Sequence, residues 1–232
     1  MSLLNKEIEI EFREMIKETS DIYSFVFNRP KELSWIPGQH AIFRNLECKA
    51  EGDKNYRIFS VASIMEEEKV MFSTRITSES TECKKMLLNL KKGDKLSIED
   101  PLGRFLITDY DKPIFLIVGG IGITPVRAFL MDMDLKSINP ERLELLYADD
   151  RGEFAYEDSL KWLDKKYTGF HLHLISDRND FMKKIEEYSK EMRNNALFYI
   201  SGTPGMNAII TEKLLEMGVD KENIKTDNFI GY

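Results

Sequence analysis

Residues 117–125 of this chain read Ile117-Val118-Gly119-Gly120-Ile121-Gly122-Ile123-Thr124-Pro125. An apolar run that ends in glycines and then in Thr-Pro predicts a strand that turns directly into a helix. Glycine lets the backbone approach a ligand, and the free N–H groups of a helix start favour an anion, with Thr124 as a candidate cap. The stretch predicts a phosphate cradle or a tight turn without a ligand. It is not GxGxxG, because Pro125 stands at the third glycine.

The region around these glycines also bears on membrane insertion. Residues 113–131 are nearly uncharged and about as long as a membrane span. The central glycines and Pro125, followed by Arg127, fit a buried strand and helix better. We therefore predict no membrane span, and the early charged residues predict no secretory signal.

The C-terminal half alternates between apolar segments and helical stretches. The apolar segments lie at residues 114–118, 143–147, 172–175 and 197–200. This alternation predicts a parallel α/β domain, which we assign to residues 111–232. A second turn, Ser201-Gly202-Thr203-Pro204-Gly205-Met206, follows the last apolar segment. Ligands bind at the carboxyl ends of parallel strands, so both turns predict one dinucleotide site, unless the second is an ordinary capped helix start.

The first 110 residues predict antiparallel β structure. Short β-rich segments, separated by glycine, proline and asparagine turns, lie at residues 6–16, 22–27, 40–46, 56–62, 69–76 and 95–99. Strands this short and this often interrupted favour an antiparallel barrel or sandwich. One helix is expected at 81–90, where Thr81 is a candidate cap and apolar residues recur at helical spacing.

Composition narrows the classes of function. Hydrophobic residues make up 42% of the chain and charged residues 31%, as in an ordinary folded protein. The 33 Lys and Arg residues against 40 Asp and Glu residues give a net charge of −7, which disfavours nucleic acid as a partner. The chain has two cysteines, Cys48 and Cys83, which are too few for an iron-sulfur cluster or a thiolate zinc site. So few cysteines favour a protein of the reducing cytoplasm, and we expect Cys83 to be a buried thiol. His171 and His173 lack a third ligand, so we predict no metal site.

Several motifs occur in a specific order along the chain. They are Pro37-Gly38-Gln39, Arg57-Ile58-Phe59-Ser60, Asp100-Pro101-Leu102-Gly103-Arg104-Phe105, the two glycine turns and the segment from Asp227 to Tyr232. In this order they resemble the ferredoxin-NADP reductase superfamily, and the resemblance runs from residue 37 to residue 232. It implies an antiparallel flavin-binding barrel, here residues 1–110, followed by a parallel α/β pyridine-nucleotide domain.

The resemblance implies how the barrel would hold a flavin. Arg57 would pair with the flavin pyrophosphate, because a guanidinium fork matches phosphate oxygens. Phe59, where Tyr is more usual, would stack on the ring system, and Ser60 would hydrogen-bond near N5, the atom that accepts hydride. A looser match would hold the rest of the flavin: Thr74, Arg75, Ile76, Ser80 and Thr81. The glycine often found before that helix is missing, so FAD is expected by family default and FMN stays open.

The resemblance also implies a nicotinamide site in the second domain. Its dinucleotide-binding residues would be Gly120, Gly122, Thr124, Gly202, Pro204 and Met206. Ser201 stands where many members have Cys beside the nicotinamide, and Phe229 and Tyr232 are both candidates for the aromatic ring that covers the flavin. The reaction mainly needs the donor carbon positioned near flavin N5.

The choice of pyridine nucleotide depends on the loop after the second strand of this domain. Asp149 would accept a hydrogen bond from the adenosine ribose and repel a 2′-phosphate, whereas Arg151 would attract one. We expect NADH rather than NADPH, because Asp149 lies closest to the strand end.

The prediction is a cytoplasmic, flavin-dependent NAD(P)H oxidoreductase. It would take a hydride from NADH or NADPH onto bound FAD and pass electrons to ferredoxin, flavodoxin or an oxygenase or reductase component. Two alternatives remain: a free flavin or ferric reductase that binds flavin as a substrate, and a non-catalytic NAD-sensing subunit. The Arg57 to Ser60 motif argues against the sensor, which needs no hydride-accepting site.

Overall fold

The computed structural model describes residues 7–45, 48 and 52–229 of the chain. These residues form two compact units. The described part of Met1–Leu106 forms the first unit together with Arg127–Asp132, and Ile107–Val126 with the described part of Met133–Tyr232 forms the second. Each unit has its own hydrophobic core.

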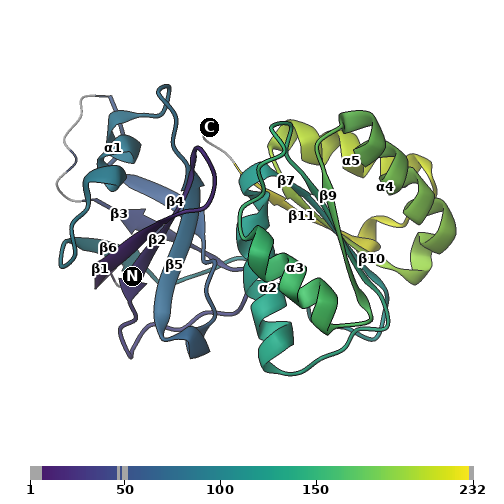
Figure 1. Cartoon of the computed structure of the whole chain (residues 1–232), viewed down its shortest axis with the longest axis horizontal. Coiled ribbons are helices and arrows are strands. Elements are labelled where there is room, and N and C mark those ends of the chain that lie inside the picture. Colours follow the sequence, from purple (N-terminus) through teal and green to yellow (C-terminus); the bar gives the residue numbers. More distant parts are fainter. Residues whose placement is uncertain (1–6, 46–47, 49–51, 230–232) are drawn as a thin grey trace, which may run out of the picture. The chain divides into compact units, whose positions relative to one another are not determined.

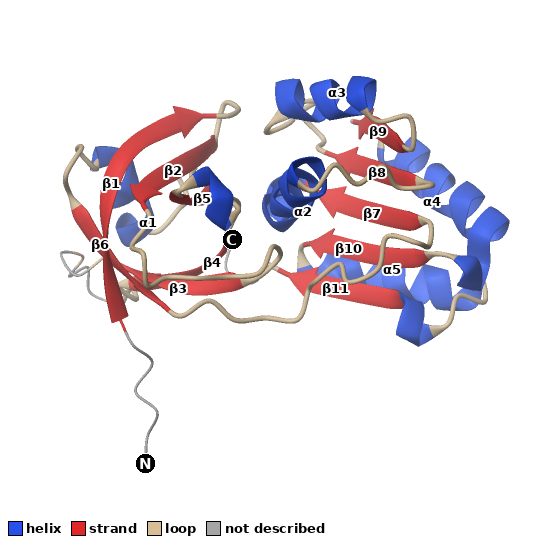
Figure 2. Ribbon diagram, turned by 90° about the horizontal axis from the view of Figure 1, so that it is seen from below, coloured by secondary structure: helices blue, strands red, loops and turns tan. Residues whose placement is uncertain are grey.

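The first unit contains a six-stranded antiparallel sheet. Its strands are β1 (Glu7–Lys17), β2 (Ile22–Asn28), β3 (His40–Arg44), β4 (Tyr56–Ser60), β5 (Lys69–Arg75) and β6 (Lys95–Glu99). They pair in the order β4-β3-β6-β1-β2-β5, and no pairing among the described residues joins β4 to β5. The sheet curves around a shared interior (Figure 2). The predicted barrel is therefore confirmed as a barrel-like sheet that stays open between its two edge strands.

Phenylalanine side chains fill the interior of this sheet. Alternation along β2 and β5 places Phe25, Phe27 and Phe72 inside, each fully buried. The ring of Phe59 from β4 stacks on Phe72, with 4.3 Å between the centroids and 7° between the planes. Phe43 of β3 packs on the same ring at 4.6 Å. Aromatic contacts therefore connect β4 to β5, and just beyond β4 the N–H of Ala62 donates to the carbonyl of Met71 at 2.7 Å.

The helix expected at residues 81–90 is present in two parts. It begins as α1 (Glu82–Lys85) and continues as a 3₁₀ helix, Met86–Asn89. Thr81 occupies the N-cap position in an extended conformation, with φ −63° and ψ 156°. Leu87 points into the core of the first unit, which explains the apolar spacing in the sequence. A further 3₁₀ turn, Met65–Glu67, lies between β4 and β5.

The second unit is a five-stranded parallel sheet with helices. Its strands are β7 (Ile114–Gly119), β8 (Leu143–Ala148), β9 (Phe170–Ile175), β10 (Leu197–Gly202) and β11 (Ile224–Asn228), in the order β11-β10-β7-β8-β9. Its helices are α2 (Ile123–Leu135), α3 (Glu157–Lys166), α4 (Arg178–Met192) and α5 (Pro204–Glu216). All four strand pairings are parallel, as predicted.

Helices cover both faces of the parallel sheet. Phe115 and Ile117 of β7 share a core with Phe181 of α4 and Ile210 of α5, so these two helices cover one face. Figures 1 and 2 show α2 and α3 on the opposite face. Because both faces are buried, the central strand β7 is a continuous apolar run, whereas the edge strands β9 and β11 also carry polar residues.

The region 113–131 is a strand, a 3₁₀ turn and the first part of a helix, not one long helix. None of the helices in the described part of the chain combines the length and the apolar character that a membrane span requires.

Candidate functional site

The two glycine turns lie side by side at one edge of the parallel sheet. β7 pairs with β8 on one side and with β10 on the other, and Val118 lies opposite Ser201. The chain runs from β7 towards β8 and β9, then returns to add β10 on the opposite side of β7. Strand order therefore reverses between β7 and β10, and ligands bind at such a switch point at the carboxyl ends of the strands.

The backbones of the two turns are in close contact. A Cβ atom added at Gly122 would lie 2.1 Å from the carbonyl oxygen of Ser201, closer than any side chain permits. Cβ atoms at Gly119 and Gly202 would lie 2.3 Å and 2.7 Å from the Sδ atom of Met206. The Met206 thioether thus packs against both turns. Gly122 is therefore required for packing, whether or not a ligand is present, because its neighbour is backbone.

Ser201 carries a buried hydroxyl without a hydrogen-bond partner in the described part of the chain. The residue is fully buried at the end of β10, and its Oγ has no donor or acceptor within reach among the described residues. A buried polar group of this kind calls for an explanation, and a ligand position is one. The side chain that sequence analysis placed at the nicotinamide therefore has hydrogen-bonding capacity to spare.

The C-terminal aromatic residues lie partly beyond the described chain. Phe229 is half-buried, and its N–H donates to the carbonyl oxygen of Gly202 at 3.0 Å. This bond holds the residue beside the second glycine turn, as expected for a ring close to the nicotinamide site. Tyr232, the other candidate, lies outside the described residues.

Asn207 belongs to this edge of the sheet, and sequence analysis missed it. The residue is buried in the first turn of α5, and its Nδ2 donates to the carbonyl of Asp227 at 2.6 Å and to Asn228 Oδ1 at 2.9 Å. Its Oδ1 atom is buried and, within the described chain, has no partner, as is the case for Ser201 Oγ. No local pattern could have identified Asn207, because its partners lie 20 and 21 residues away.

The helix starts differ from the prediction in one respect. Thr124 is the second residue of α2, and its buried hydroxyl donates to the carbonyl oxygen of Ile121 at 2.8 Å. The prediction that Thr124 caps the helix is therefore wrong, because the helix begins one residue earlier. At α5 the cap is Thr203, whose hydroxyl accepts from Met206 N at 3.3 Å, and Pro204 is the first helical residue.

Asp149 and Arg151, the two residues expected to set the preference between NADH and NADPH, interact with each other. Asp149 directly follows β8, and its carboxylate is buried. Its Oδ1 accepts from the N–H of Arg151 at 3.1 Å and lies 3.5 Å from Arg151 Nε. These contacts hold the Asp149 carboxylate in the turn, whereas the Arg151 side chain is 40% exposed and faces solvent. The opposite effects expected of the two residues on a 2′-phosphate would therefore be coupled.

In the first unit, Arg57 contacts Thr81, and an acid not singled out in the sequence joins them. Arg57 Nη2 donates to Asp53 Oδ1 at 2.7 Å and also to Thr81 Oγ1. Arg57 Nη1 donates to the carbonyls of Lys54 at 2.6 Å and Tyr56 at 2.8 Å. The guanidinium is thus held in one orientation beside the start of α1.

Positive charge gathers around Arg57. Lys84, in the helix that follows Thr81, is buried, and burial together with the charges of Arg57 and Arg75 lowers its pKa to about 8. Arg75 lies 3.4 Å from Asp21. Burial is the larger cause of this lowered pKa, since Arg57 is paired with Asp53 and Arg75 with Asp21.

The remaining residues assigned to the flavin are less closely gathered. Thr74 is buried in β5. The N–H of Ile76 donates to the carbonyl of Asp21 at 2.7 Å, and Ser80 Oγ accepts from Thr77 N at 3.0 Å. Ser60 is buried at the end of β4. Phe59 is half-buried and presents one ring face to Phe72. The backbone of Ile76 is therefore already used within the protein.

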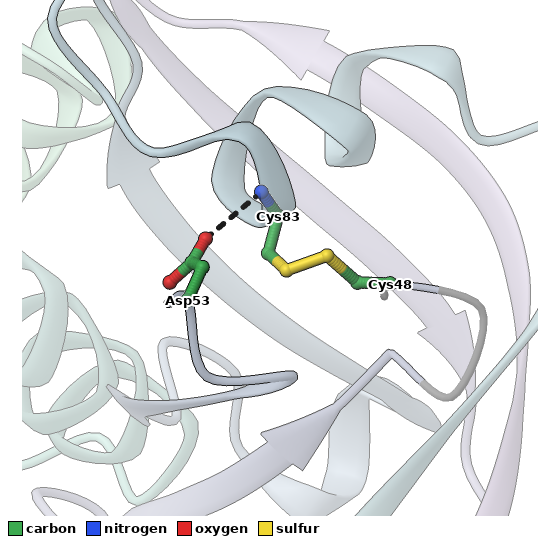
Figure 3. A group of neighbouring side chains, drawn as sticks. All are labelled: Cys48, Asp53 and Cys83. Carbon is green, nitrogen blue, oxygen red and sulfur yellow. Dashed lines mark hydrogen bonds between the residues drawn. A yellow bond between two sulfur atoms is a disulfide. The ribbon is translucent and has the colours of Figure 1, made fainter. Parts of the chain in front are cut away.

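Cys48 and Cys83 form a disulfide (Figure 3), with their Cα atoms 5.4 Å apart. The prediction of a buried thiol at Cys83 is wrong. The two cysteines are 35 residues apart in the sequence, and the fold brings the loop after β3 to the start of α1. Asp53 lies beside the disulfide, where its Oδ2 accepts from the N–H of Cys83 at 3.1 Å.

Comparison with known proteins supports the family resemblance. No family model matches the chain. It is 30% identical over 217 residues to a subunit of the Na(+)-translocating NADH-quinone reductase of Shewanella denitrificans, covering 83% of this chain and 53% of that protein. The corresponding protein of Pseudoalteromonas atlantica is also 30% identical, over 213 residues that cover 82% of this chain and 52% of that one. The chain thus spans about half the length of these curated relatives.

Solved structures show the same fold. Ferredoxin-NADP+ reductase from Plasmodium falciparum superposes with a TM-score of 0.82 at 15% identity, covering 97% of each chain. The FAD/NAD-binding domain of nitric oxide dioxygenase from Vibrio cholerae gives 0.75 at 21% identity, covering 95% of this chain and 98% of that one. The chain therefore has the two-domain fold of these solved structures, the fold that the resemblance to the ferredoxin-NADP reductase superfamily implies.

Proposed function

We propose that this chain is a flavin-dependent NAD(P)H oxidoreductase that passes electrons from a reduced pyridine nucleotide to a redox partner. The observation that carries the proposal is the junction of the two glycine turns at the switch point of the parallel sheet. There the close contact of Gly122 with Ser201 adjoins two buried polar atoms without partners in the described chain, Ser201 Oγ and Asn207 Oδ1. Buried polar atoms without partners are unfavourable, so a turn that served only packing would not be expected to contain them.

The second unit would bind the nucleotide. Gly120, Gly122 and Gly202 would lie next to the pyrophosphate through the backbone of the two turns, which Gly122 brings into contact. Ser201 Oγ would hydrogen-bond the nicotinamide end. Pro204 and Met206 would shape the turn, and Phe229 would cover the reacting ring. Thr124 would contribute through its place in the first turn of α2, since its hydroxyl is bonded to Ile121.

NADH is the proposed donor. The buried carboxylate of Asp149 disfavours a 2′-phosphate, and the relatives belong to an enzyme named for NADH. Replacing Asp149 with Ala would release Arg151 and shift the preference toward NADPH by at least about tenfold, the effect of one lost charged hydrogen bond. Steady-state kcat/KM with both nucleotides measures this shift. An unchanged ratio would remove Asp149 from the assignment.

The first unit would bind the flavin, FAD in preference to FMN. Arg57, Thr81 and Lys84 would face its phosphates, and Phe59, Ser60, Thr74, Arg75, Ile76 and Ser80 would contact the rest. The Arg57 guanidinium, held in one orientation beside Thr81, supports a phosphate there. When bound, flavin supplies an acceptor that takes two electrons together and releases them singly. The protein's own contribution is to orient the two ligands and to exclude water.

The electron acceptor would be a separate redox protein or subunit. The relatives and structural neighbours include a subunit of a quinone reductase, ferredoxin reductases and a cytochrome P450 reductase. Ferredoxin, flavodoxin or an oxygenase or reductase component are therefore the proposed partner classes. The proposed location of the activity is the cytoplasm, and the Cys48–Cys83 disulfide is the observation that speaks against a reducing compartment.

An anaerobic absorbance spectrum tests the proposal directly. The purified protein, as isolated and after addition of FAD, is titrated first with NADH and then with NADPH. We expect a flavin band that bleaches with NADH at lower concentration than with NADPH. Absence of a flavin band after addition of FAD, together with tight NADH binding, would overturn the proposal in favour of a nucleotide sensor. A band lost during gel filtration would favour a free flavin reductase.

A further inference from the structure

The end of β11 leads to Phe229, the ring proposed above to cover the reacting ring, and apolar burial does little to hold this end. β11 is an outermost strand of the parallel sheet, so within the described chain it pairs with β10 alone (Figure 2). Of its five residues, Ile224 at the start is apolar and buried, whereas Lys225, Thr226 and Asn228 are exposed. A strand end of this kind opens easily unless polar contacts fix it.

The side chain of Asn207 fixes this end from the neighbouring helix. The N–H of Asn207 donates to the carbonyl of Thr203 at 2.9 Å, so its backbone is part of the first turn of α5. Its Nδ2 donates to the carbonyl of Asp227 at 2.6 Å and to Oδ1 of Asn228 at 2.9 Å. A side-chain amide has two N–H donors, and both are used here. One side chain thus joins the start of the helix to the last two residues of the strand.

A backbone bond continues this contact to Phe229. Gly202 lies opposite Asn228 in the pairing of β10 with β11, and its carbonyl accepts from the N–H of Phe229 at 3.0 Å. A Cβ atom added at Gly202 would lie 3.4 Å from Oδ1 of Asn207, so the amide lies against the same glycine. Asn207 and Gly202 therefore set together the direction in which the chain leaves β11.

The orientation of the Asn207 amide indicates what the residue is for. An amide turned by 180° would place Oδ1 against the carbonyl oxygen of Asp227, so the two donors must face the strand. Oδ1 is then buried without a partner among the described residues. An apolar side chain of the same size would avoid the cost of this buried acceptor. Stability alone therefore does not account for an asparagine at this position, whereas the two donated bonds do.

We propose that Asn207 is a positioning residue of the nicotinamide site, whose amide holds the end of β11 beside the second glycine turn and thereby sets the place of Phe229. The inference rests on the proposed function, because the place of Phe229 matters to the reaction only if the nucleotide binds at this edge. Asn207 acts through Phe229 and not by contact with the nucleotide. Loss of the amide therefore affects the nicotinamide half of NADH and not the adenosine half proposed to lie at Asp149.

Hydrogen exchange of the flavin-free protein tests the contact itself. Asn207→Leu has nearly the same size and removes both donors together with the unpartnered acceptor. Its melting temperature should stay within about 4 °C of the wild type. Mass spectrometry should show residues 224–229 exchanging about tenfold faster or more, the effect of two lost hydrogen bonds, with β7 and β8 unchanged. Asn228→Ala, at an exposed position, removes one of the two bonds and should give a smaller increase in the same segment.

Asn194 provides the matched control, because it makes similar bonds at the opposite end of the same strand. Its Oδ1 accepts from Asp220 N at 2.7 Å and from Asn223 Nδ2 at 3.3 Å, just before β11 begins. Asn194→Ala should speed exchange at residues 220–223 and leave the end of β11 unchanged. It should also leave the rate of flavin reduction by NADH unchanged.

Kinetics of the FAD-loaded protein show whether the contact serves the nicotinamide. Asn207→Leu should slow flavin reduction by saturating NADH about fivefold or more in stopped-flow measurements. The Kd of ADP-ribose, which lacks nicotinamide, should stay the same. In a Phe229→Ala background, Asn207→Leu should slow the reaction no further, because both substitutions remove the same placed ring.

The outcomes distinguish this role from the proposed function. Unchanged exchange at residues 224–229 in Asn207→Leu would overturn the role of Asn207 and leave the proposed function intact. Faster exchange with an unchanged reduction rate would overturn the positioning role, as would equal weakening of ADP-ribose. Additive effects of Asn207→Leu and Phe229→Ala would show that Asn207 does not act through Phe229. Wild-type protein that binds neither flavin nor NADH would overturn the proposed function and this role with it.

Discussion

At the scale of single residues, a substitution at Ser201 distinguishes a role in ligand binding from a role in packing. Its hydroxyl is fully buried and makes no hydrogen bond within the described chain. Replacing Ser201 with Ala removes a group that no described residue satisfies, so the free energy of unfolding should change by less than about 1 kcal/mol. If the hydroxyl serves the nicotinamide, NADH-dependent flavin reduction should slow about five- to tenfold in stopped-flow measurements, the loss of one hydrogen bond.

Ser63 provides the matched control for this experiment. It is also fully buried, but its hydroxyl donates to the carbonyl of Lys69 at 2.8 Å and accepts from Met71 N at 3.0 Å. Ser63→Ala leaves both groups unpaired and should cost about 1–3 kcal/mol in urea denaturation. The opposite pattern, a stable Ser63→Ala and a destabilised Ser201→Ala, would show that Ser201 has a structural partner.

Residue roles are predictable where they follow from local sequence and not where they depend on distant partners. Arg57 can be singled out from the sequence because it belongs to one of the ordered motifs, whereas its contact with Thr81 appears only in the folded chain. Asp53 and the disulfide cannot, because a loop between β3 and β4 reaches α1 only in the folded chain. The cap expected at Thr124 is misplaced by two residues, since Ile123 begins the helix and no sequence rule sets that boundary.

At the scale of elements, the contact between β10 and the turn after β7 depends on Gly122. A Cβ atom there would lie 2.1 Å from the Ser201 carbonyl, which is backbone and has no side-chain freedom to move away. Gly122→Ala should therefore cost about 3 kcal/mol of stability and weaken NADH binding at least tenfold, because the two turns must separate. Differential scanning calorimetry and NADH fluorescence measure the two effects.

Gly205→Ala is the control within the same sheet edge. A Cβ atom at Gly205, the second residue of α5, would meet nothing within 4 Å, and the backbone there has no positive φ. Stability should stay within about 1 kcal/mol, or rise slightly through higher helix propensity. A tolerated Gly122→Ala would mean that the two turns do not depend on close contact.

A polar junction between β8, β9 and α4 should make the second unit sensitive to acid. Burial alone would raise the pKa of Glu144, but hydrogen bonds from His173 and Arg142 and the charge of Arg142 lower it to about 2. Since this folded-state pKa lies below the unfolded value of 4.5, the pair stabilises the fold above pH 4.5. That contribution, about 3 kcal/mol, is lost as the pH falls from 4.5 toward 2.

The Glu144→Gln variant isolates this effect. Its unfolding free energy should be lower than that of the wild type at pH 7, and the difference should shrink as the pH approaches 2. Urea titrations at several pH values across that range measure it. A constant difference throughout would show that Glu144 does not titrate with the lowered pKa, and that its contribution is packing alone.

Whole elements are easier to predict than their contacts. The strands β6 and β7 are placed by the sequence within a residue, because turn residues bracket short apolar or β-branched runs. The fold class follows from the change of pattern near residue 111. Strand β11 was missed, because Ile224–Asn228 has one apolar residue and is ordered by pairing with β10. Asn207, which bonds to that strand, was missed for the same reason.

At the scale of the whole molecule, two contact units with separate cores predict that each ligand protects its own unit. A ligand present at about 100 times its Kd adds about 2.7 kcal/mol to the free energy of every opening that releases it. Hydrogen exchange followed by mass spectrometry should therefore show up to about a 100-fold slowing, with NADH acting on the turns after β7 and β10 and FAD acting on β4 and α1. Riboflavin should leave α1 unprotected, because it has no phosphate for Arg57. Protection of β4 and α1 by NADH in flavin-free protein would contradict the division of labour between the two units.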